Sequence, residues 1–360
     1  MFFFSILLTI AALVGLMIIH ELGHFLLAKK FGMSIEEFGV GLPPKIKKWK
    51  IGSTIYSLNL IPFGAFVRIK GEEGETKDGD GFRDYAIWKR IVVLLGGVVA
   101  TWITAIIILS VIAGVWGFPE AISDQTVSPE AKLQVVSVLN DWPAEIAGIK
   151  MGDEIMGYYQ EDELILINKV EDFTEMTQPY LGREVTLSIN RKNENLIVFV
   201  VPKESEDSNR AVIGIGLSRV RTKQYNWLEA PLAGLQITIN QTIAIPATLG
   251  YTFSRWVRHE SIPGVKIMGP IGIGKIMSDA AVLGINYFLQ LLALIAIYLT
   301  LFNIFPIPAL DGGKILFLLI GKIRKKEIKA STENKINTIF FGSLMLVLVV
   351  VTISDIISLF

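Results

Sequence analysis

Four long apolar stretches constrain this chain more than any other feature. A helix needs about 20 mainly apolar residues to cross the hydrocarbon core of a bilayer. Residues 2–28, 91–117 and 339–360 meet this requirement, and residues 282–305 are equally apolar but run into prolines. Only 19% of the chain is charged, against roughly 25% in soluble domains. The sequence therefore predicts a polytopic α-helical membrane protein with about four transmembrane helices.

The charges that flank these stretches predict the side on which each loop lies. Residues 29–90 contain twelve Lys and Arg, several of them next to the apolar ends. By the positive-inside rule this loop is cytoplasmic, so the middle of the chain and both termini are expected outside. The uncharged residues 230–254 could form a fifth span. However, their Gln, Asn and Pro residues favour a helix at the interface or packed on protein.

Net charge and cysteine content exclude some classes of site. The formal net charge is zero, and the chain has no cysteine. We therefore expect no nucleic-acid partner, no disulfide framework and no thiolate metal site.

Residues 128–205 read as a water-soluble, β-rich insert. Short strand-like runs such as "EVTLSI" and "NLIVFVV" alternate with turn residues and charges. The stretch "LQVVSVLNDWPAEIAGIKMGDEI" resembles a PDZ domain, although Trp142 stands where a small residue is usual. This resemblance implies a groove in which an extended peptide adds as a further strand. Another small β-domain is the alternative.

The first apolar stretch contains the motif "HELGH", with His20, Glu21 and His24. Residues four apart lie on the same face of a helix, and H-E-x-x-H holds zinc with two imidazoles while the glutamate activates water. Charged groups at membrane depth cost about 2.5–3.5 kcal/mol each. A zinc site worth roughly 10–16 kcal/mol can offset several. The alternative is a pair of hydrogen-bonded histidines with Glu21 as their counter-ion.

A third ligand is expected from the far end of the chain, because catalytic zinc takes three protein ligands. The stretch "LFNIFPIPALDGGKI" places Asp311 at membrane depth, where Pro306 and Pro308 break the helix. The two glycines that follow permit close approach of the backbone. The other histidine, His259, lies in the hydrophilic "SRWVRHE" and is expected to be solvated.

In order, HELGH, the PDZ-like insert and N-x-x-P-x-P-x-L-D-G-G resemble the bacterial site-2 protease family of intramembrane zinc metalloproteases. The resemblance implies that His20, His24 and Asp311 bind Zn2+ and that Glu21 is the general base. It also implies that Asn303 binds substrate or steadies the oxyanion. An interhelical hydrogen bond is the alternative for Asn303.

Two other stretches bear on this resemblance. "IPFGAFVRIKGE" is similar to the family's P-x-G-G-x-V loop, with Ala65 in place of the second glycine. It implies a membrane-associated β-hairpin, with residues 53–69 as the strand edge that holds an unwound substrate. In the second span the family tends to show G-P-x-x-N, whereas this chain has "GGVVAT" at residues 96–101.

These inferences divide the chain into eight segments. In order, we expect a first transmembrane helix at 1–28, a cytoplasmic loop with the β-hairpin at 29–90, a second transmembrane helix at 91–117, the PDZ-like domain at 128–205, an extracytoplasmic linker with peripheral amphipathic helices at 206–281, a third transmembrane segment broken at LDGG at 282–321, a basic cytoplasmic loop at 322–338 and a fourth transmembrane helix at 339–360.

The expected activity is hydrolysis of peptide bonds within or near the transmembrane segments of single-span membrane proteins, after a first extracytoplasmic cut. The resemblance implies anti-sigma-factor-like proteins or signal-peptide remnants as substrates, a peptide ligand for the PDZ-like domain, and a place in the bilayer of the bacterial cytoplasmic membrane. A membrane adaptor and a zinc transporter are the rival functions. The glutamate within H-E-x-x-H favours the protease, because neither rival needs a base at that position.

Overall fold

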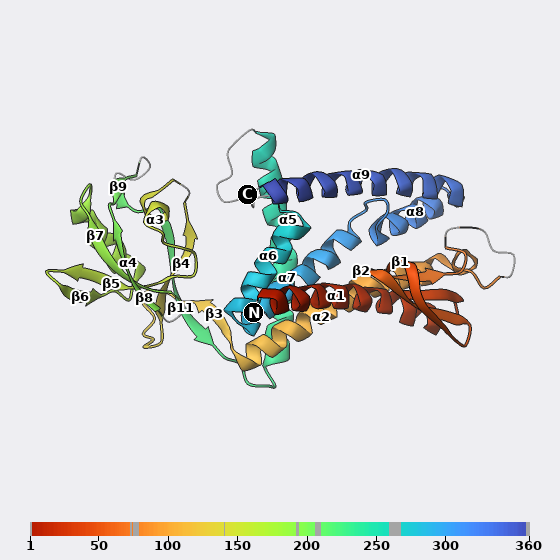
Figure 1. Ribbon diagram of the computed structural model, residues 1–360, viewed down its shortest axis with the longest axis horizontal. Helices are drawn as coiled ribbons and strands as arrows, with labels where there is room; N and C mark the ends of the chain where they lie inside the picture. The colour runs from red at the N-terminus through yellow and green to blue at the C-terminus, as the bar shows by residue number, and fades with distance from the viewer. Residues whose placement is uncertain are drawn as a thin grey trace. The chain divides into compact units, whose positions relative to one another are not determined.

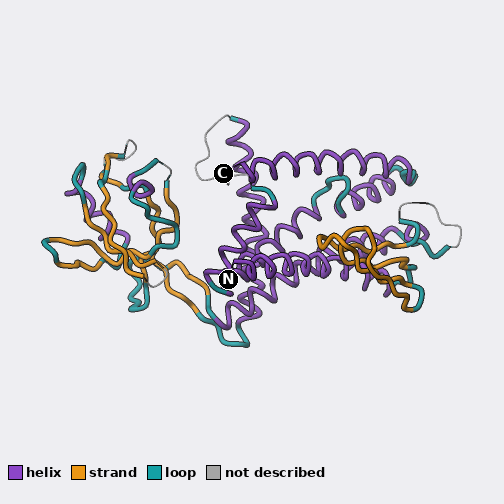
Figure 2. The backbone as a smooth tube through the Cα atoms, viewed as in Figure 1, coloured by secondary structure: helices purple, strands orange, loops and turns teal. Residues whose placement is uncertain are grey.

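The computed structural model describes residues 2–72, 74, 79–139, 141–191, 194–205, 210–258 and 268–357. The chain divides into two compact units. One comprises residues 1–114, 226–248 and 267–360, and it contains most of the helices and a β-hairpin (Figure 2). The other comprises residues 115–225 and 249–266 and is rich in strands.

Within the described residues, four helices are long and apolar enough to cross a membrane (Figure 1). They are α1 (Phe2–Lys30), α2 (Ile87–Val115), α7 (Ile285–Ile304) and α9 (Ala330–Ile357). Helix length and composition therefore agree with the four predicted spans.

Small and hydroxyl residues bring α1, α2 and α7 together. A Cβ on Gly23 of α1 would lie 2.2 Å from the carbonyl oxygen of Gly96 of α2, so the two backbones are in direct contact. The Oγ1 atoms of Thr101 and Thr300 are hydrogen-bonded at 3.0 Å between α2 and α7. Close backbone contact and hydroxyl hydrogen bonds are typical of helices that pack inside a membrane. The "GGVVAT" stretch therefore has a packing role of its own here.

The third membrane segment is broken where the prolines predict it. Helix α7 ends at Ile304, and α8 (Asp311–Ile323) begins at the predicted ligand. The glycines after Asp311 let the returning chain touch the connection: a Cβ on Gly312 would lie 2.1 Å from Phe305 O, and one on Gly313 would lie 2.3 Å from Ile307 O. Residues with side chains could not take this path.

Strands β1 (Ile35–Ile51) and β2 (Thr54–Ile69) form an antiparallel two-stranded hairpin. Glu37 is buried in it and accepts hydrogen bonds from Lys45 Nζ at 2.8 Å and Ser57 Oγ at 2.6 Å. Burial alone would raise the pKa of Glu37, but these two partners hold it below its usual range. The hairpin packs against α1 through an aromatic cluster that includes Phe25 and Phe38, whose ring centroids are 5.4 Å apart.

Two further helices lie in the segment expected as an extracytoplasmic linker with helices, residues 206–281. Helix α5 (Ala230–Val257) continues through Pro246 as one long helix. Its first half lies along α2, where Trp102 Nε1 donates to Thr242 Oγ1 at 3.1 Å. Helix α6 (Pro270–Leu283) packs on α1. Packing on protein is one of the two arrangements that the sequence favours for residues 230–254, and the first half of α5 packs on α2. His259 lies outside the described residues.

In the residues that the structure describes, the second unit is built on one sheet of seven strands. Its order is β3 (Phe118–Ala121), β11 (Ile215–Lys223), β4 (Lys132–Val138), β5 (Glu154–Gln160), β7 (Val185–Arg191) and β8 (Glu194–Val200), with β6 (Glu163–Leu166) beside β5. Its short helices are α3 (Pro143–Ile146) and α4 (Val170–Thr177), and β9 (Lys203–Glu204) pairs with β10 (Ala211–Val212). The described residues also include 3-10 turns at Phe82–Asp84 in the first unit and Gln178–Tyr180 in the second.

This sheet continues past residue 205, the predicted end of the insert. Strand β11 lies inside the sheet, between β3 and β4. The sequence did not reveal it, because glycines interrupt the apolar alternation of "IGIGLSRV". Trp142, the residue that departs from the PDZ pattern, is covered by Lys203, whose ammonium lies 4.0 Å from the centre of its ring.

Candidate metal centre

His20 and His24 lie one turn apart on the buried face of α1. The side chains are 10% and 7% exposed, and their Nε2 atoms are 3.2 Å apart. Their rings meet edge to face, with centroids separated by 4.8 Å. The helical spacing of HELGH therefore directs both imidazoles at one point inside the first unit.

Asp311, the first residue of α8, brings a carboxylate to the same point. Its Oδ2 atom is 3.0 Å from His20 Nε2 and 3.3 Å from His24 Nε2. The proline-broken connection before α8 makes this possible, because it turns the start of a new helix towards α1. The two histidines of α1 and an aspartate 291 positions after His20 thus converge, as the sequence predicted.

The donor set fits a zinc ion. Zinc binds nitrogen and oxygen at about 2.0–2.2 Å, so tetrahedral ligands are separated by about 3.3 Å. The three separations here, 3.0, 3.2 and 3.3 Å, match that spacing. The other ring nitrogen of His24, Nδ1, lies 2.9 Å from Val93 O of α2. A proton on Nδ1 leaves the Nε2 lone pair for a metal, as is usual for a histidine ligand.

Gly97 of α2 forms a wall of the site. A Cβ at this position would lie 2.4 Å from His24 Nε2 and 2.7 Å from His20 Nε2. Any side chain at residue 97 would therefore press directly on the two donor atoms. The sequence showed this glycine only as part of a departure from a family motif, and nothing in the pattern indicated what it faces.

Glu21 lies between the histidines and the β-hairpin. The potential ligand atoms of His20, Glu21 and His24 all lie within 4.8 Å of one another. Glu21 Oε2 accepts a hydrogen bond from the backbone N–H of Val67 in β2 at 3.0 Å. Because the Val67 amide is directed at Glu21, the outer edge of β2 faces the candidate metal centre at this residue.

Asn303 is the second-last residue of α7, which ends at Ile304. Its Nδ2 donates to Leu299 O at 2.9 Å, which is a hydrogen bond within α7 rather than between helices. Its role towards substrate stays a prediction.

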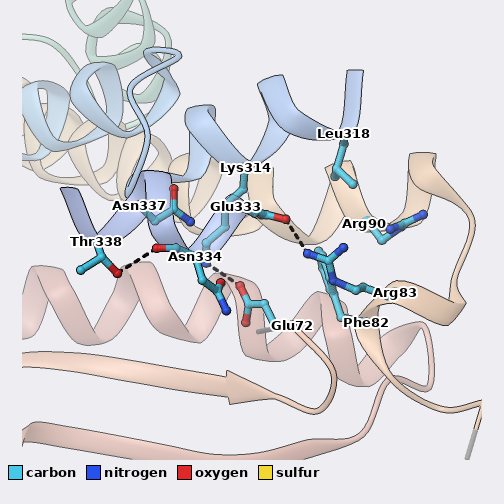
Figure 3. A pocket seen from close by; sticks show the side chains of 10 residues that line it. All are labelled: Glu72, Phe82, Arg83, Arg90, Lys314, Leu318, Glu333, Asn334, Asn337 and Thr338. Carbon is cyan, nitrogen blue, oxygen red and sulfur yellow. Dashed lines mark hydrogen bonds and ion pairs between the residues drawn. The ribbon is translucent and has the colours of Figure 1, made fainter. Parts of the chain in front are cut away.

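A polar cavity of about 340 Å³ lies beside α8. Lys314, one turn after Asp311, donates to Glu72 at 2.5 Å, and Arg83 pairs with Glu333 of α9 (Figure 3). These ion pairs join α8 to the segment that follows β2, and α9 to the segment that precedes α2. The sequence did not point to them, because they join charges more than 200 residues apart.

Comparisons with known proteins agree with this geometry. The family model of peptidase family M50 matches residues 8–347. A protein of Clostridium perfringens named as a zinc metalloprotease is 33% identical over 354 residues, which cover 98% of each chain. The regulator of sigma-W protease RasP of Bacillus subtilis is 27% identical over an alignment 426 positions long, which covers 96% of each chain. The zinc metalloprotease RasP of Geobacillus kaustophilus is 25% identical, covering 98% of this chain and 97% of its own. This chain therefore belongs to peptidase family M50, the site-2 protease family, and is a zinc metalloprotease of the membrane.

Proposed function

We propose that this chain hydrolyses peptide bonds within or near the transmembrane segments of single-span membrane proteins, with Zn2+ held by His20, His24 and Asp311. The observation that carries this proposal is the convergence of three donor atoms, each within 3.3 Å of the others, from α1 and α8. A bound zinc ion would supply Lewis acidity for the scissile carbonyl and for an attacking water.

Glu21 is the general base in this proposal. It takes a proton from the water molecule as the water oxygen bonds to the carbonyl carbon, and it returns that proton to the amide nitrogen as the C–N bond breaks. Its carboxylate lies beside both imidazoles, and the Val67 amide orients one of its oxygens. The buried surroundings keep bulk water away from the reacting groups.

The outer edge of β2 is the proposed holder of the substrate. A helical segment has no accessible peptide bond, so it must unwind before it is cut. An unwound segment can add to an exposed strand edge through backbone hydrogen bonds. Val67 places that edge against Glu21, and residues 53–69 belong to the hairpin expected to act in this way. Asn303 is the proposed amide donor to substrate or to the oxyanion.

We assign the second unit as a PDZ-like domain on the extracytoplasmic side, with both termini on the same side of the bacterial cytoplasmic membrane. Strand β11 pairs with β4 along residues 215–220, whereas β3 pairs only with residues 220–223. In the described part of the chain, residues 215–218 pair with no strand on the edge that β3 uses further along, and α4 contacts β11. A peptide could add there as a further strand.

The proposed substrates have lost their external domain to a first cut. The PDZ-like domain then acts as a size filter that admits the shortened protein. Anti-sigma-factor-like proteins and signal-peptide remnants both fit this class, and the name of the Bacillus subtilis relative, regulator of sigma-W protease, supports the first.

The test uses Glu21→Gln in the purified full chain, with a single-span substrate and a measurement of bound zinc. Lost cleavage with retained zinc is expected, whereas Glu36→Gln, an exposed position on β1, should change neither. Undiminished cleavage by Glu21→Gln would end the proposal. Zinc flux into proteoliposomes would indicate a transporter instead, and peptide binding without cleavage by the wild type would indicate an adaptor.

The first-cut requirement has its own test. The same substrate is supplied with its external domain either intact or removed. Faster cleavage of the shortened form is expected, and equal rates would contradict the size filter without touching the zinc site.

A further inference from the structure

Ala309 adopts an unusual backbone conformation two residues before Asp311. Its φ is +78°, in the left-handed region where a residue with a Cβ is disfavoured. Such a conformation persists only where its surroundings hold it in place. In this structure the backbone N–H of Ala309 donates to Asn337 Oδ1 at 3.0 Å. Asn337 lies on α9, 28 residues away in sequence.

This hydrogen bond is one of the contacts that hold α9 to the rest of the first unit. Residues 338–350 of α9 are all exposed. Near its start, Glu333 pairs with Arg83 and Asn337 holds Ala309. Near its end, Asp355 accepts hydrogen bonds from the N–H groups of Gly269 and Gly272 at 3.0 and 2.8 Å. The helix is therefore tied to the protein at its ends, and one tie reaches the loop that carries Asp311.

Asn337 also lines the polar cavity together with Lys314 (Figure 3). Lys314 is on the first turn of α8, so the cavity borders the same helix start that carries Asp311. The Asn337 side chain therefore contacts the turn between α7 and α8 through Ala309 and borders the cavity at the start of α8.

We propose that Asn337 is a positioning residue for Asp311. Its side-chain carbonyl holds Ala309 in the left-handed turn, and this turn sets the point at which α8 begins and the direction in which the Asp311 carboxylate faces. The inference rests on the proposed role of Asp311 as a zinc ligand. It adds that the fourth membrane helix takes part in shaping the metal centre.

The physical reason lies in the short distance along the chain. Only Leu310 separates Ala309 from Asp311, and the Leu310 N–H is bonded to Ile307 O at 3.2 Å. If Ala309 relaxed to a negative φ, the start of α8 would be redirected. The separations of 3.0 and 3.3 Å between Asp311 and the two histidines would then be lost. Partners that orient a ligand are worth about 10- to 100-fold in metal affinity when removed.

The experiment measures zinc affinity of the purified full chain by competition with a chelator. Asn337→Ala should weaken zinc binding by about 10- to 100-fold, whereas Asn337→Asp, which keeps an acceptor oxygen, should lose much less. Ser343→Ala is the matched control on α9, because the Ser343 hydroxyl donates within its own helix, to Phe340 O. It should bind zinc as the wild type does.

A second substitution tests whether the effect passes through Ala309. Glycine adopts positive φ freely, so Ala309→Gly should restore most of the zinc affinity lost in Asn337→Ala. Unchanged affinity in Asn337→Ala would overturn the inference, and so would a loss that Ala309→Gly fails to restore. Failure of the proposed function appears differently: Asp311→Ala would then keep its zinc whatever happens at Asn337.

Discussion

Replacing Gly97 with alanine tests whether α2 leaves space for a metal ion at the two histidines. The new methyl carbon would lie 2.4 Å from His24 Nε2 and 2.7 Å from His20 Nε2. Ordinary contact between non-bonded heavy atoms is about 3.5 Å or more, so the overlap is about 1 Å. Metal–ligand distances tolerate only about 0.2 Å. We therefore expect zinc content to fall from about one ion per chain to nearly none.

The same substitution should leave the fold largely intact. Alanine is more favourable than glycine inside a helix by about 1 kcal/mol, and overpacking in a core costs about 1–3 kcal/mol. The net loss is then at most about 2 kcal/mol. In the purified protein, Gly97→Ala should therefore lower the zinc content greatly and the melting temperature only slightly.

Gly15→Ala in α1 is the control, because a Cβ there meets nothing within 4 Å. It should gain about 1 kcal/mol of stability from helix propensity and keep its zinc. If Gly97→Ala also kept one zinc ion and full cleavage activity, the steric reasoning about this wall of the site would be refuted.

Two further predictions concern stability. Asp355→Ala should lower the free energy of unfolding by about 1 kcal/mol, because the N–H groups of Gly269 and Gly272 at the start of α6 lose their acceptor. Thermal unfolding in detergent measures this loss. An unchanged melting temperature would contradict the role of this carboxylate. Glu37 has a lowered pKa, so its contribution is present above the ordinary value of 4.5 and is lost as the pH falls through the lower folded-state value. The stability advantage of the wild type over Glu37→Gln should therefore shrink below about pH 4.5, and a constant difference from pH 7 to pH 3 would contradict this.

Much of the site could be predicted because its chemistry is encoded locally. The i, i+4 spacing of His20 and His24 needs only a helix to bring two imidazoles together, and their position inside an apolar run made a solvated role costly. Asp311 was found by a different route: two prolines ended one helix, and the family pattern identified the carboxylate that follows.

The residues that sequence reasoning missed act through contacts across the fold. Gly97 is one of four glycines in the apolar residues 91–117, and its effect depends entirely on the atoms opposite it. In the sequence, Asn337 looks like a polar residue at the start of an apolar helix. Its partner, the backbone N–H of Ala309, is 28 residues earlier and is not visible in the pattern. Every residue except proline has a backbone N–H, so a side chain that bonds to one requires no particular residue type in its partner, and a sequence pattern cannot detect the pair.

In the fold, too, features encoded locally could be predicted, whereas features that depend on contacts across the fold could not. Apolar runs of membrane length predicted the four spanning helices, since burial in lipid constrains composition over a whole helix. Strand β11 was not foreseen, whereas a helix was expected over residues 230–254, where α5 (Ala230–Val257) lies. Glycines weaken the apolar alternation of β11. Proline usually breaks a helix, but α5 continues through Pro246.

The zinc K-edge X-ray absorption spectrum of the purified chain, compared with that of Asp311→Ala, tests the central claim most directly. We predict two imidazole nitrogens and one carboxylate oxygen around zinc in the wild type, and loss of that oxygen with most of the bound zinc in the variant. A variant that retained one zinc ion per chain with an unchanged spectrum would contradict the assignment of Asp311 as a ligand.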